Sequence, residues 1–267
     1  MTSLFRKSRI NINLNIQSYA PIKNLIRFII SQSGHNNTGR IVSFSKSWRV
    51  RRNYRFLDFK RMIWDLPAKI LRIEYDPNRS SLIALICYYN GILSYILATE
   101  KMTVGQIIFT TLNKLLLKHN GNATLLYNCL EGSFLSAVEF RPGMGGILAR
   151  SAGTQVILLK SLNYLESVIR LPSKEEIVIK KISLVSLGRC SNIDRKFRYY
   201  YNAGQTRRIG KRPTSRGVAQ NPIDHPHGGG GGRCLVTAWA KIAKNKTTRQ
   251  KKSSFFIVTS RKFYKKK

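Results

Sequence analysis

Residues 80–99 read SSLIALICYYNGILSYILAT, a run of twenty positions without a charged residue. A run of this length could form one membrane-spanning helix. However, two stretches rich in β-branched and aromatic residues, 82–89 and 92–98, flank Asn90-Gly91, and an Asn-Gly pair between such stretches is the strongest short-range signal for a β-hairpin. Three serines also make the run too polar for a spanning helix. We therefore predict an antiparallel hairpin and no membrane partner.

Further β-strands are expected on both sides of this hairpin. Residues 69–75 and 104–109 are neighbouring strand-like stretches, which predicts a small antiparallel barrel or sheet of the size that commonly binds oligonucleotides. A second series of short strands, separated by glycine and proline turns, predicts a compact barrel. Its members are residues 134–140, 155–160, 164–170 and 176–184. The chain is therefore expected to have an all-β core.

Charge is distributed unevenly along the 267 residues. The 47 Lys and Arg outnumber the 12 Asp and Glu, which gives a formal net charge of +35. Residues 1–57 hold eleven cations and no acid, whereas residues 195–267 hold twenty cations and one acid, Asp224. The intervening residues are nearly balanced, and 43% hydrophobic content is enough for a core. This layout predicts a folded centre with two basic arms that bind a polyanion, with nucleic acid favoured over an anionic membrane surface.

A proline- and glycine-rich stretch near the C-terminus reads NPIDHPHGGGGGR over residues 221–233. Two prolines and five consecutive glycines indicate a surface loop. Glycines let another backbone come close, and bare N–H groups beside arginines suit a phosphate. A flexible linker is one alternative, but it would have no use for the two histidines. A zinc site with Cys234 lacks the usual ligand spacing, and a catalytic site lacks a nucleophile or an acid pair.

Aromatic and basic residues are mixed in both arms. Residues 39–61 and 195–201 combine cations with phenylalanine, tyrosine or tryptophan, which suits backbone pairing plus base stacking. Residues 241–267 hold eleven Lys or Arg, and we expect this tail to be disordered without a partner. Residues 1–35 are basic and acid-free, as in an organellar transit peptide or an RNA-binding arm. Because the sequence starts at Met1, we expect that nothing was cleaved from it.

Cysteine and glycine patterns indicate no cofactor. The four cysteines are widely spaced and form no Cys-x-x-Cys pair, so reduced thiols in an intracellular compartment are expected; they are Cys87, Cys129, Cys190 and Cys234. Gly145-Gly146 could belong to a nucleotide-binding loop, but no Gly-Lys-Ser/Thr follows it. We predict no cofactor, and any structural Mg²⁺ is expected to be held through RNA.

Six motifs follow one another along the chain. They are Asn36–Ile41 (NNTGRI), Asp58–Arg61 (DFKR), Glu74–Ser80 (EYDPNRS), Arg141–Gly146 (RPGMGG), Arg150–Thr154 (RSAGT) and Asn221–Arg233. Together they resemble the bacterial-type family of large-subunit ribosomal protein L-two, over about residues 36–267. Two positions depart from that family: Gly231 stands where it usually has Glu, and residues 46–52 read KSWRVRR in place of a Gly-Gly-Gly-His run. The second departure adds cations and reduces close backbone approach.

The resemblance implies a structural, non-enzymatic protein of the large ribosomal subunit that supports the peptidyl-transferase centre and subunit association. It implies four regions: a basic N-terminal arm (1–61), an OB-like RNA-binding domain (62–118), an SH3-like barrel (119–190) and an extended basic C-terminal region (191–267). The partners would be large-subunit rRNA, neighbouring ribosomal proteins and the small subunit. A chain rich in Ile, Asn, Lys and Tyr suits an AT-rich organelle genome. We therefore expect a mitochondrial ribosome, with a plastid or a bacterial cytoplasm as alternatives.

Motifs and basic arms together define the residues expected to bind rRNA. They are Arg40, Lys60, Arg61, Arg79, Arg150, Ser151, Arg207, Arg208, Arg212, Arg216, Asn221, Asp224, His225, His227, Gly228, Gly229, Gly230 and Arg233. Arg79 has a second interpretation, because an arginine after Asp76-Pro77-Asn78 could simply pair with Asp76. Asp224, His225 and His227 are also the groups of the alternative function, an enzyme that acts on RNA.

Overall fold

The structure is a computed structural model that describes residues 20–112, 119–230 and 256–260. The chain separates into two compact units. The first unit comprises residues 1–29, 52–199 and 253–267, and the second comprises residues 30–51 and 200–252. Each unit is therefore assembled from segments that are far apart in the sequence.

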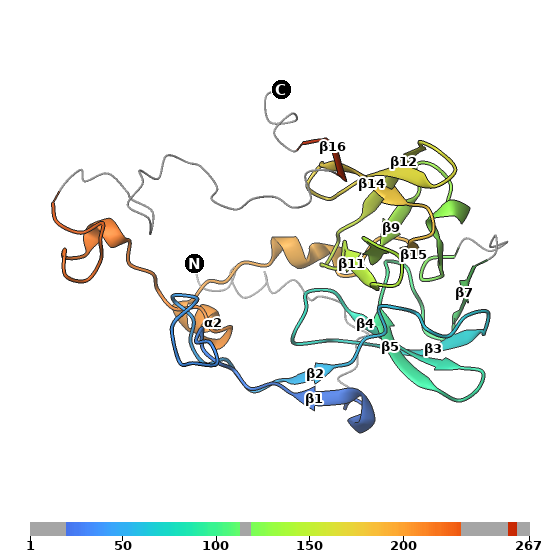
Figure 1. The fold of residues 1–267 in the computed structure, drawn as a ribbon. Helices are drawn as coiled ribbons and strands as arrows, with labels where there is room; N and C mark the ends of the chain where they lie inside the picture. Colours follow the sequence, from blue (N-terminus) through green and yellow to red (C-terminus); the bar gives the residue numbers. More distant parts are fainter. Residues whose placement is uncertain (1–19, 113–118, 231–255, 261–267) are drawn as a thin grey trace, which may run out of the picture. The chain divides into compact units, whose positions relative to one another are not determined.

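The predicted hairpin lies at the edge of a four-stranded sheet in the first unit (Figure 1). Its strands, β4 (Ile83–Tyr88) and β5 (Leu93–Leu97), pair antiparallel. Gly91 in the connecting turn has a φ of +82°, which glycine adopts without a Cβ clash. β3 (Ala68–Glu74) and β6 (Ile107–Ile108) complete the order β5-β4-β3-β6. The prediction of a hairpin is confirmed.

Burial of β4 on both faces explains why residues 80–99 lack charge. Ala84 and Ile86 belong to one apolar cluster, whereas Ile83 and Leu85 belong to another. Alternate residues of a strand point to opposite faces, so a strand covered on both faces reads as a continuous apolar run. Three residues from the N-terminal part of the chain pack on the second cluster: Ile22, Leu25 and Leu57.

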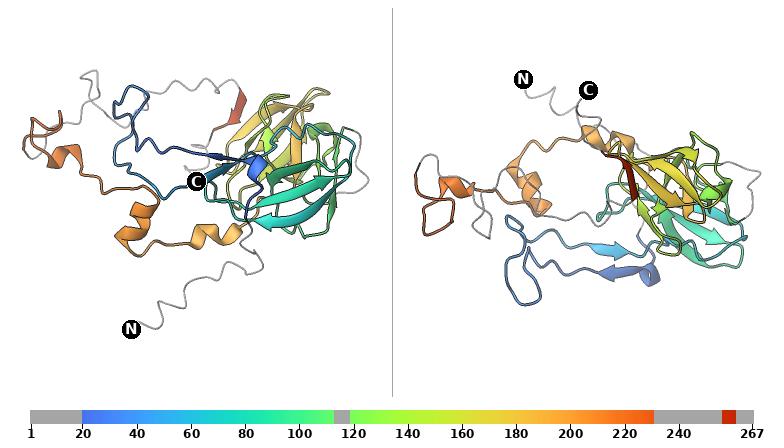
Figure 2. Two further views of the ribbon diagram at one scale, coloured as in Figure 1. Left: turned by 90° about the horizontal axis from the view of Figure 1, so that it is seen from below. Right: turned by 45° about the horizontal axis from the view of Figure 1, so that its top comes forward.

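A two-stranded ribbon precedes this sheet in the sequence. β1 (Ile26–Phe28) follows the short helix η1 (Lys23–Leu25) and pairs antiparallel with β2 (Asn53–Arg55). Figure 2 shows the ribbon in blue beside the four-stranded sheet. The N-terminal region therefore contains strands, although its sequence has no clear alternation of apolar and polar residues.

The larger sheet of the first unit has eight strands in the order β16-β14-β13-β12-β9-β15-β8-β7. In chain order these are β7 (Thr110–Thr111), β8 (Ala123–Leu125), β9 (Phe134–Ser136), β12 (Val156–Ser161), β13 (Glu166–Arg170), β14 (Glu176–Lys180), β15 (Leu184–Leu187) and β16 (Ile257–Thr259). A separate pair, β10 (Val138–Glu139) and β11 (Gly146–Leu148), and the short helix η2 (Leu126–Asn128) accompany them. The all-β core is confirmed.

The stretch 176–184, expected as one strand, forms two. A turn separates β14 from β15, and the Ser183 N–H donates to the Lys180 carbonyl at 3.0 Å. β14 pairs with β13, whereas β15 pairs with β8 and β9. Ile177 and Ile179 of β14 and Val185 of β15 pack in the same core, whereas Ile182 in the turn is apolar but exposed. The apolar residues on both sides of the turn made the stretch resemble one strand.

β16 is a strand within the basic tail that the sequence analysis did not anticipate. It pairs antiparallel with β14, and Ile257 packs on the core of the larger sheet. The Thr259 hydroxyl donates to Glu176 Oε2 at 2.8 Å. Phe256 contacts Phe140 edge to face, with ring centroids 5.3 Å apart. The rest of the tail, for which we expected disorder, lies outside the described residues.

Short helices follow β15 along the chain. η3 (Ile193–Phe197) belongs to the first unit, whereas α2 (Ala203–Arg208) and η4 (Gly217–Ala219) belong to the second. None of the helices in the described part of the chain has the length and apolar character needed to span a bilayer.

Cys190 is buried and Cys129 is partly buried, and we expect Cys190 to resist alkylation. Burial raises the pKa of Cys190 to about 11 and that of Cys129 to about 12. The thiolate is the reactive form, so at pH 8 iodoacetamide should label Cys190 more than roughly a hundredfold more slowly in the folded chain than in urea. Peptide mass spectrometry would measure both rates. Equal rates would contradict the burial of this thiol.

Candidate nucleic-acid interface

The DFKR motif forms a tight turn organised by Asp58. The carboxylate Oδ1 accepts the N–H groups of Lys60 at 3.0 Å and Arg61 at 2.7 Å, and Oδ2 accepts that of Met62 at 3.3 Å. A side chain that caps its own following backbone is a strong local determinant of a turn. As a result, Lys60 is exposed and Arg61 points inward.

Arg61, predicted to contact RNA, has a buried side chain in this structure. Only 4% of the residue is exposed, and Nη2 donates to the Gly121 carbonyl at 3.1 Å. Burial lowers the pKa of the guanidinium, although nearby Tyr88 and Asp58 oppose this shift. We infer that Arg61 holds the turn in place, while Lys60 is the residue of this motif that can reach a phosphate.

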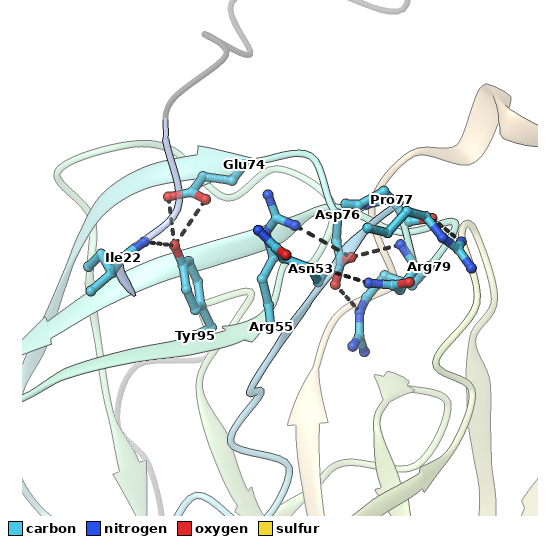
Figure 3. Close-up of polar contacts among 10 residues, drawn as sticks. Ile22, Asn53, Arg55, Glu74, Asp76, Pro77, Arg79 and Tyr95 are labelled. Atoms are coloured by element: carbon cyan, nitrogen blue, oxygen red, sulfur yellow. Dashed lines mark hydrogen bonds and ion pairs between the residues drawn. The ribbon is translucent and has the colours of Figure 1, made fainter. Parts of the chain in front are cut away.

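Arg79 forms an ion pair with Asp76, which confirms the alternative interpretation that the sequence suggested for this arginine (Figure 3). Asp76 is fully buried; its Oδ2 lies 2.6 Å from Arg79 Nε, and its Oδ1 accepts the Asn78 N–H at 2.8 Å. Arg55 Nη1 lies 4.0 Å from the same carboxylate. The pair fixes the Arg79 guanidinium by one edge, and the terminal nitrogens carry further donors suited to a phosphate. Contact between Arg79 and RNA stays a prediction.

The N-terminal segment is tied to the sheet beside this turn by Tyr95 and Glu74 (Figure 3). The Tyr95 hydroxyl donates to the Glu74 carboxylate, 3.0 Å from Oε2, and accepts the Ile22 N–H at 3.3 Å. Arg72 Nε lies 2.6 Å from Glu74 Oε1. Burial raises the pKa of Tyr95, so the phenol stays protonated and keeps its donor role.

Two predicted arginines from different motifs converge on the ring of Phe59. The guanidinium carbon of Arg79 lies 5.8 Å from the ring centroid, and that of Arg150 lies 5.2 Å from it. We call these three residues the arginine–phenylalanine cluster. Arg150 and the neighbouring Ser151 are exposed. The Arg79 side chain is only 17% exposed, so Arg150 is the more accessible cation of the cluster. Contacts of this kind hold a guanidinium against the face of an aromatic ring.

Hydrogen bonds between loops of the two sheets fix this cluster. The Ala152 N–H donates to Ser80 Oγ at 3.0 Å, and the Ser81 hydroxyl donates to the Arg150 carbonyl at 3.2 Å. Asn192 Nδ2 donates to the Ser80 carbonyl at 2.7 Å. These hydrogen bonds connect the loop that carries Arg79 to the loop that carries Arg150. They therefore fix the positions of the two arginines relative to each other.

Glu139 organises the RPGMGG loop next to this cluster. The carboxylate is buried; Oε1 accepts the Gly145 N–H at 2.7 Å, and Oε2 accepts those of Gly143 at 3.2 Å and Leu184 at 3.0 Å. The Gly146 N–H donates to the Phe59 carbonyl at 2.8 Å. These glycine N–H groups are therefore engaged within the protein, which argues against the nucleotide-binding alternative. Sequence analysis missed Glu139, although a lone acid in the apolar stretch 134–140 is a signal for such a role.

In the second unit, the described part of the stretch 221–233, residues 221–230, is an internally bonded turn rather than a bare linker, and we call it the histidine loop. The Asn221 carbonyl accepts the N–H groups of Asp224 at 3.0 Å and His225 at 3.2 Å. The Gly228 N–H donates to the His225 carbonyl at 2.9 Å. The His227 N–H donates to His225 Nδ1 at 3.0 Å. The centroids of the two imidazole rings lie 4.6 Å apart. The described loop therefore presents two adjacent imidazoles from a defined backbone.

Most of the remaining predicted contacts in the second unit are on its surface. Arg40, Arg207, Arg208, Arg212, Arg216, Asn221 and Asp224 are exposed, as are Gly229 and Gly230. Arg233 and Gly231 lie outside the described residues. Within the described ranges, no three His, Cys, Asp or Glu side chains are grouped closely enough to hold a metal ion.

Comparison with known proteins shows the family. The family described as Ribosomal Proteins L2, RNA binding N-terminal domain, matches residues 22–110, and Ribosomal Proteins L2, C-terminal domain, matches residues 119–249. The large ribosomal subunit protein uL2 of Cereibacter sphaeroides is 42% identical over 92% of this chain and 89% of its own length. That of Orientia tsutsugamushi is 43% identical over 90% of this chain and 89% of its own length. The chain belongs to the uL2 family of ribosomal proteins.

Proposed function

We propose that this protein is a structural, non-enzymatic constituent of the large ribosomal subunit that binds the subunit's rRNA. The observation that carries the proposal is the arginine–phenylalanine cluster, in which loops of two sheets hold the partly buried Arg79 and the exposed Arg150 against one ring. The net charge of +35 supports a polyanionic partner. The relatives named above are large-subunit proteins, and their RNA-binding domain matches the part of the chain that holds Phe59 and Arg79.

A finer assignment extends this proposal. The histidine loop lies among rRNA helices, where it supports the peptidyl-transferase centre and the association of the subunits, next to neighbouring ribosomal proteins. The four-stranded sheet is the core of an OB-like domain within residues 62–118. The strands β8 to β15 form an SH3-like barrel within residues 119–190, and β7 and β16 extend its sheet from outside that range. The ribosome is mitochondrial, with a plastid or bacterial ribosome as the alternative. His225 and His227 make contacts rather than transfer protons. In support of this for His225, its Nδ1 already accepts the His227 N–H.

Sedimentation tests the assignment. An epitope-tagged chain should travel with the large subunit when a lysate of its source cells or organelles is spun through a sucrose gradient, and it should be released together with rRNA-bound proteins at high salt. A chain that stays at the top of the gradient would refute the proposal.

Binding to isolated rRNA should depend steeply on salt. Each phosphate contacted contributes about −0.9 to the slope of log affinity against log salt, so six or more contacts predict roughly a thousandfold loss between 50 and 200 mM. Lys60→Gln should make the slope shallower by about 1. Arg170→Gln is the matched control, because Arg170 is engaged by Glu176 at 2.9 Å. Filter binding at several salt concentrations measures both slopes, and a flat response would exclude phosphate contacts as the main source of affinity.

A further inference from the structure

Two basic segments of the second unit, far apart in the sequence, join through a short antiparallel bridge. Lys46 lies opposite Lys211 in this bridge. The Ser47 N–H donates to the Gly210 carbonyl at 3.1 Å, and the Arg212 N–H donates to the Ser45 carbonyl at 2.9 Å. The Thr214 hydroxyl donates to Ser45 Oγ at 2.7 Å. The N-terminal and C-terminal arms thus meet at a specific register.

The register brings two like charges together. The two backbone bonds flank Lys46 and Lys211 rather than connecting them, so this is a non-hydrogen-bonded pair, in which Cα atoms approach to about 4.5 Å and side chains are closest. Side chains of directly opposed residues project from the same face, and like charges in that position destabilise the pairing. The bridge therefore forms against electrostatic repulsion.

One further cation, Arg49, lies at this bridge, and no carboxylate among the described residues forms an ion pair with its lysines. Gly210 has a φ of +83°, and a Cβ there would lie 2.8 Å from Arg49 Nε, so the Arg49 stem rests directly on this glycine. The sequence of the second unit contains a single carboxylate side chain, Asp224. Among the described residues, neither lysine of the bridge forms an ion pair, and both are exposed. An anion is the missing partner.

We propose that Lys46 and Lys211 form a phosphate clamp, in which one stretch of nucleic-acid backbone neutralises both lysines and so joins the two arms. The proposal rests on the proposed function and adds a site to it. Phe44 and Trp48 lie two residues before and after Lys46 and are 80% and 71% exposed. Aromatic rings beside a phosphate site stack on bases, so the fitting ligand is RNA rather than an anion without bases. The arms close on RNA, and closure and binding strengthen each other.

Hydrogen exchange of the full-length chain tests the clamp, because the amides of Ser47 and Arg212 report the bridge directly. Without RNA, both should exchange quickly in the wild type. Adding rRNA purified from bacterial large subunits should slow them at least tenfold. Lys46→Glu places a carboxylate opposite Lys211, so it should slow both amides without RNA by roughly threefold to tenfold and weaken RNA binding. Arg51→Glu, the same charge change elsewhere on this arm, should weaken binding without slowing them.

The outcomes separate this inference from the proposed function. If rRNA binds with a steep salt dependence but the two amides are unaffected, or if they are equally protected without RNA, the clamp is wrong and the proposed function stands. If Lys46→Glu, like Arg51→Glu, fails to slow exchange of the Ser47 and Arg212 amides without RNA, the proposed clamp is also wrong. If rRNA does not bind, the proposed function itself fails. Heparin at equal charge should protect the amides less than rRNA does, and equal protection would refute the assignment to nucleic acid.

Discussion

Glu139→Leu should lower the free energy of unfolding of the first unit by about 2–6 kcal/mol. The leucine would leave two buried N–H groups, those of Gly145 and Leu184, without their acceptor, together with the partly buried N–H of Gly143. Each unsatisfied buried donor costs roughly 1–3 kcal/mol. Urea denaturation followed by tryptophan fluorescence measures the change. The variant should also bind rRNA more weakly, because the loop that contacts the Phe59 backbone would lose its anchor.

Two further variants make this result interpretable. Glu139→Gln keeps one carbonyl oxygen as an acceptor but places an amide NH₂ against another N–H donor. Its free energy of unfolding should therefore lie between that of the wild type and that of Glu139→Leu. Glu100→Gln alters a partly exposed acid and should change stability by no more than about 0.5 kcal/mol. Wild-type stability of Glu139→Leu would show that the carboxylate is not the organiser of the loop.

Gly230→Val should prevent incorporation of the chain into large subunits while leaving the first unit folded. Gly230 has a φ of +94°, which a β-branched residue adopts only at a cost of roughly 1–3 kcal/mol. No described atom lies within 4 Å of the position of its Cβ, so a valine would project into the space where we propose the RNA. Co-sedimentation with large subunits measures incorporation, and far-UV circular dichroism monitors the fold.

Neighbouring glycines provide matched comparisons within the same unit. At Gly228, a Cβ would overlap the Asn221 carbonyl and lie 2.5 Å from the Gln220 oxygen, so Gly228→Ala should distort the loop even without RNA. Gly204 lies within α2 and has open space around its Cβ position. Gly204→Ala should therefore assemble normally and stabilise the helix by about 0.5–1 kcal/mol. Normal assembly of Gly230→Val would contradict both the strain and the proposed RNA contact.

Local patterns predicted the parts of the fold that local interactions determine. The Asn90-Gly91 turn between two apolar stretches identified the β4–β5 hairpin, and short strands between turn residues identified the all-β core. Likewise, the short spacing from Asp76 to Arg79 was enough to suggest their ion pair. In each case the contacting residues are close together in the sequence. A short stretch of sequence therefore includes both partners of the contact and is enough to predict it.

Long-range contacts could not be predicted in this way. Nothing near Phe59 shows that Arg79 and Arg150 meet on its ring, because that depends on how two sheets are joined. Arg61 looked like its neighbour Lys60, and only tertiary packing separates a buried arginine from an exposed lysine. The bridge between Lys46 and Lys211 was equally hidden, since like charges give no reason to expect pairing.

The position of β16 in the chain affects the order in which the first unit can be completed. β16 is the last of the described strands to leave a translating ribosome, whereas its partner β14 is made about eighty residues earlier. Until then the outer edge of β14 presents unpaired N–H and C=O groups, a template on which other chains can add. The whole basic segment that joins Tyr199 to Ser253 is also synthesised during this interval. The eight-stranded sheet is therefore completed only after this basic segment has emerged. If the segment binds rRNA, as we propose, binding can begin on a nascent chain in which β16 has not yet paired with β14.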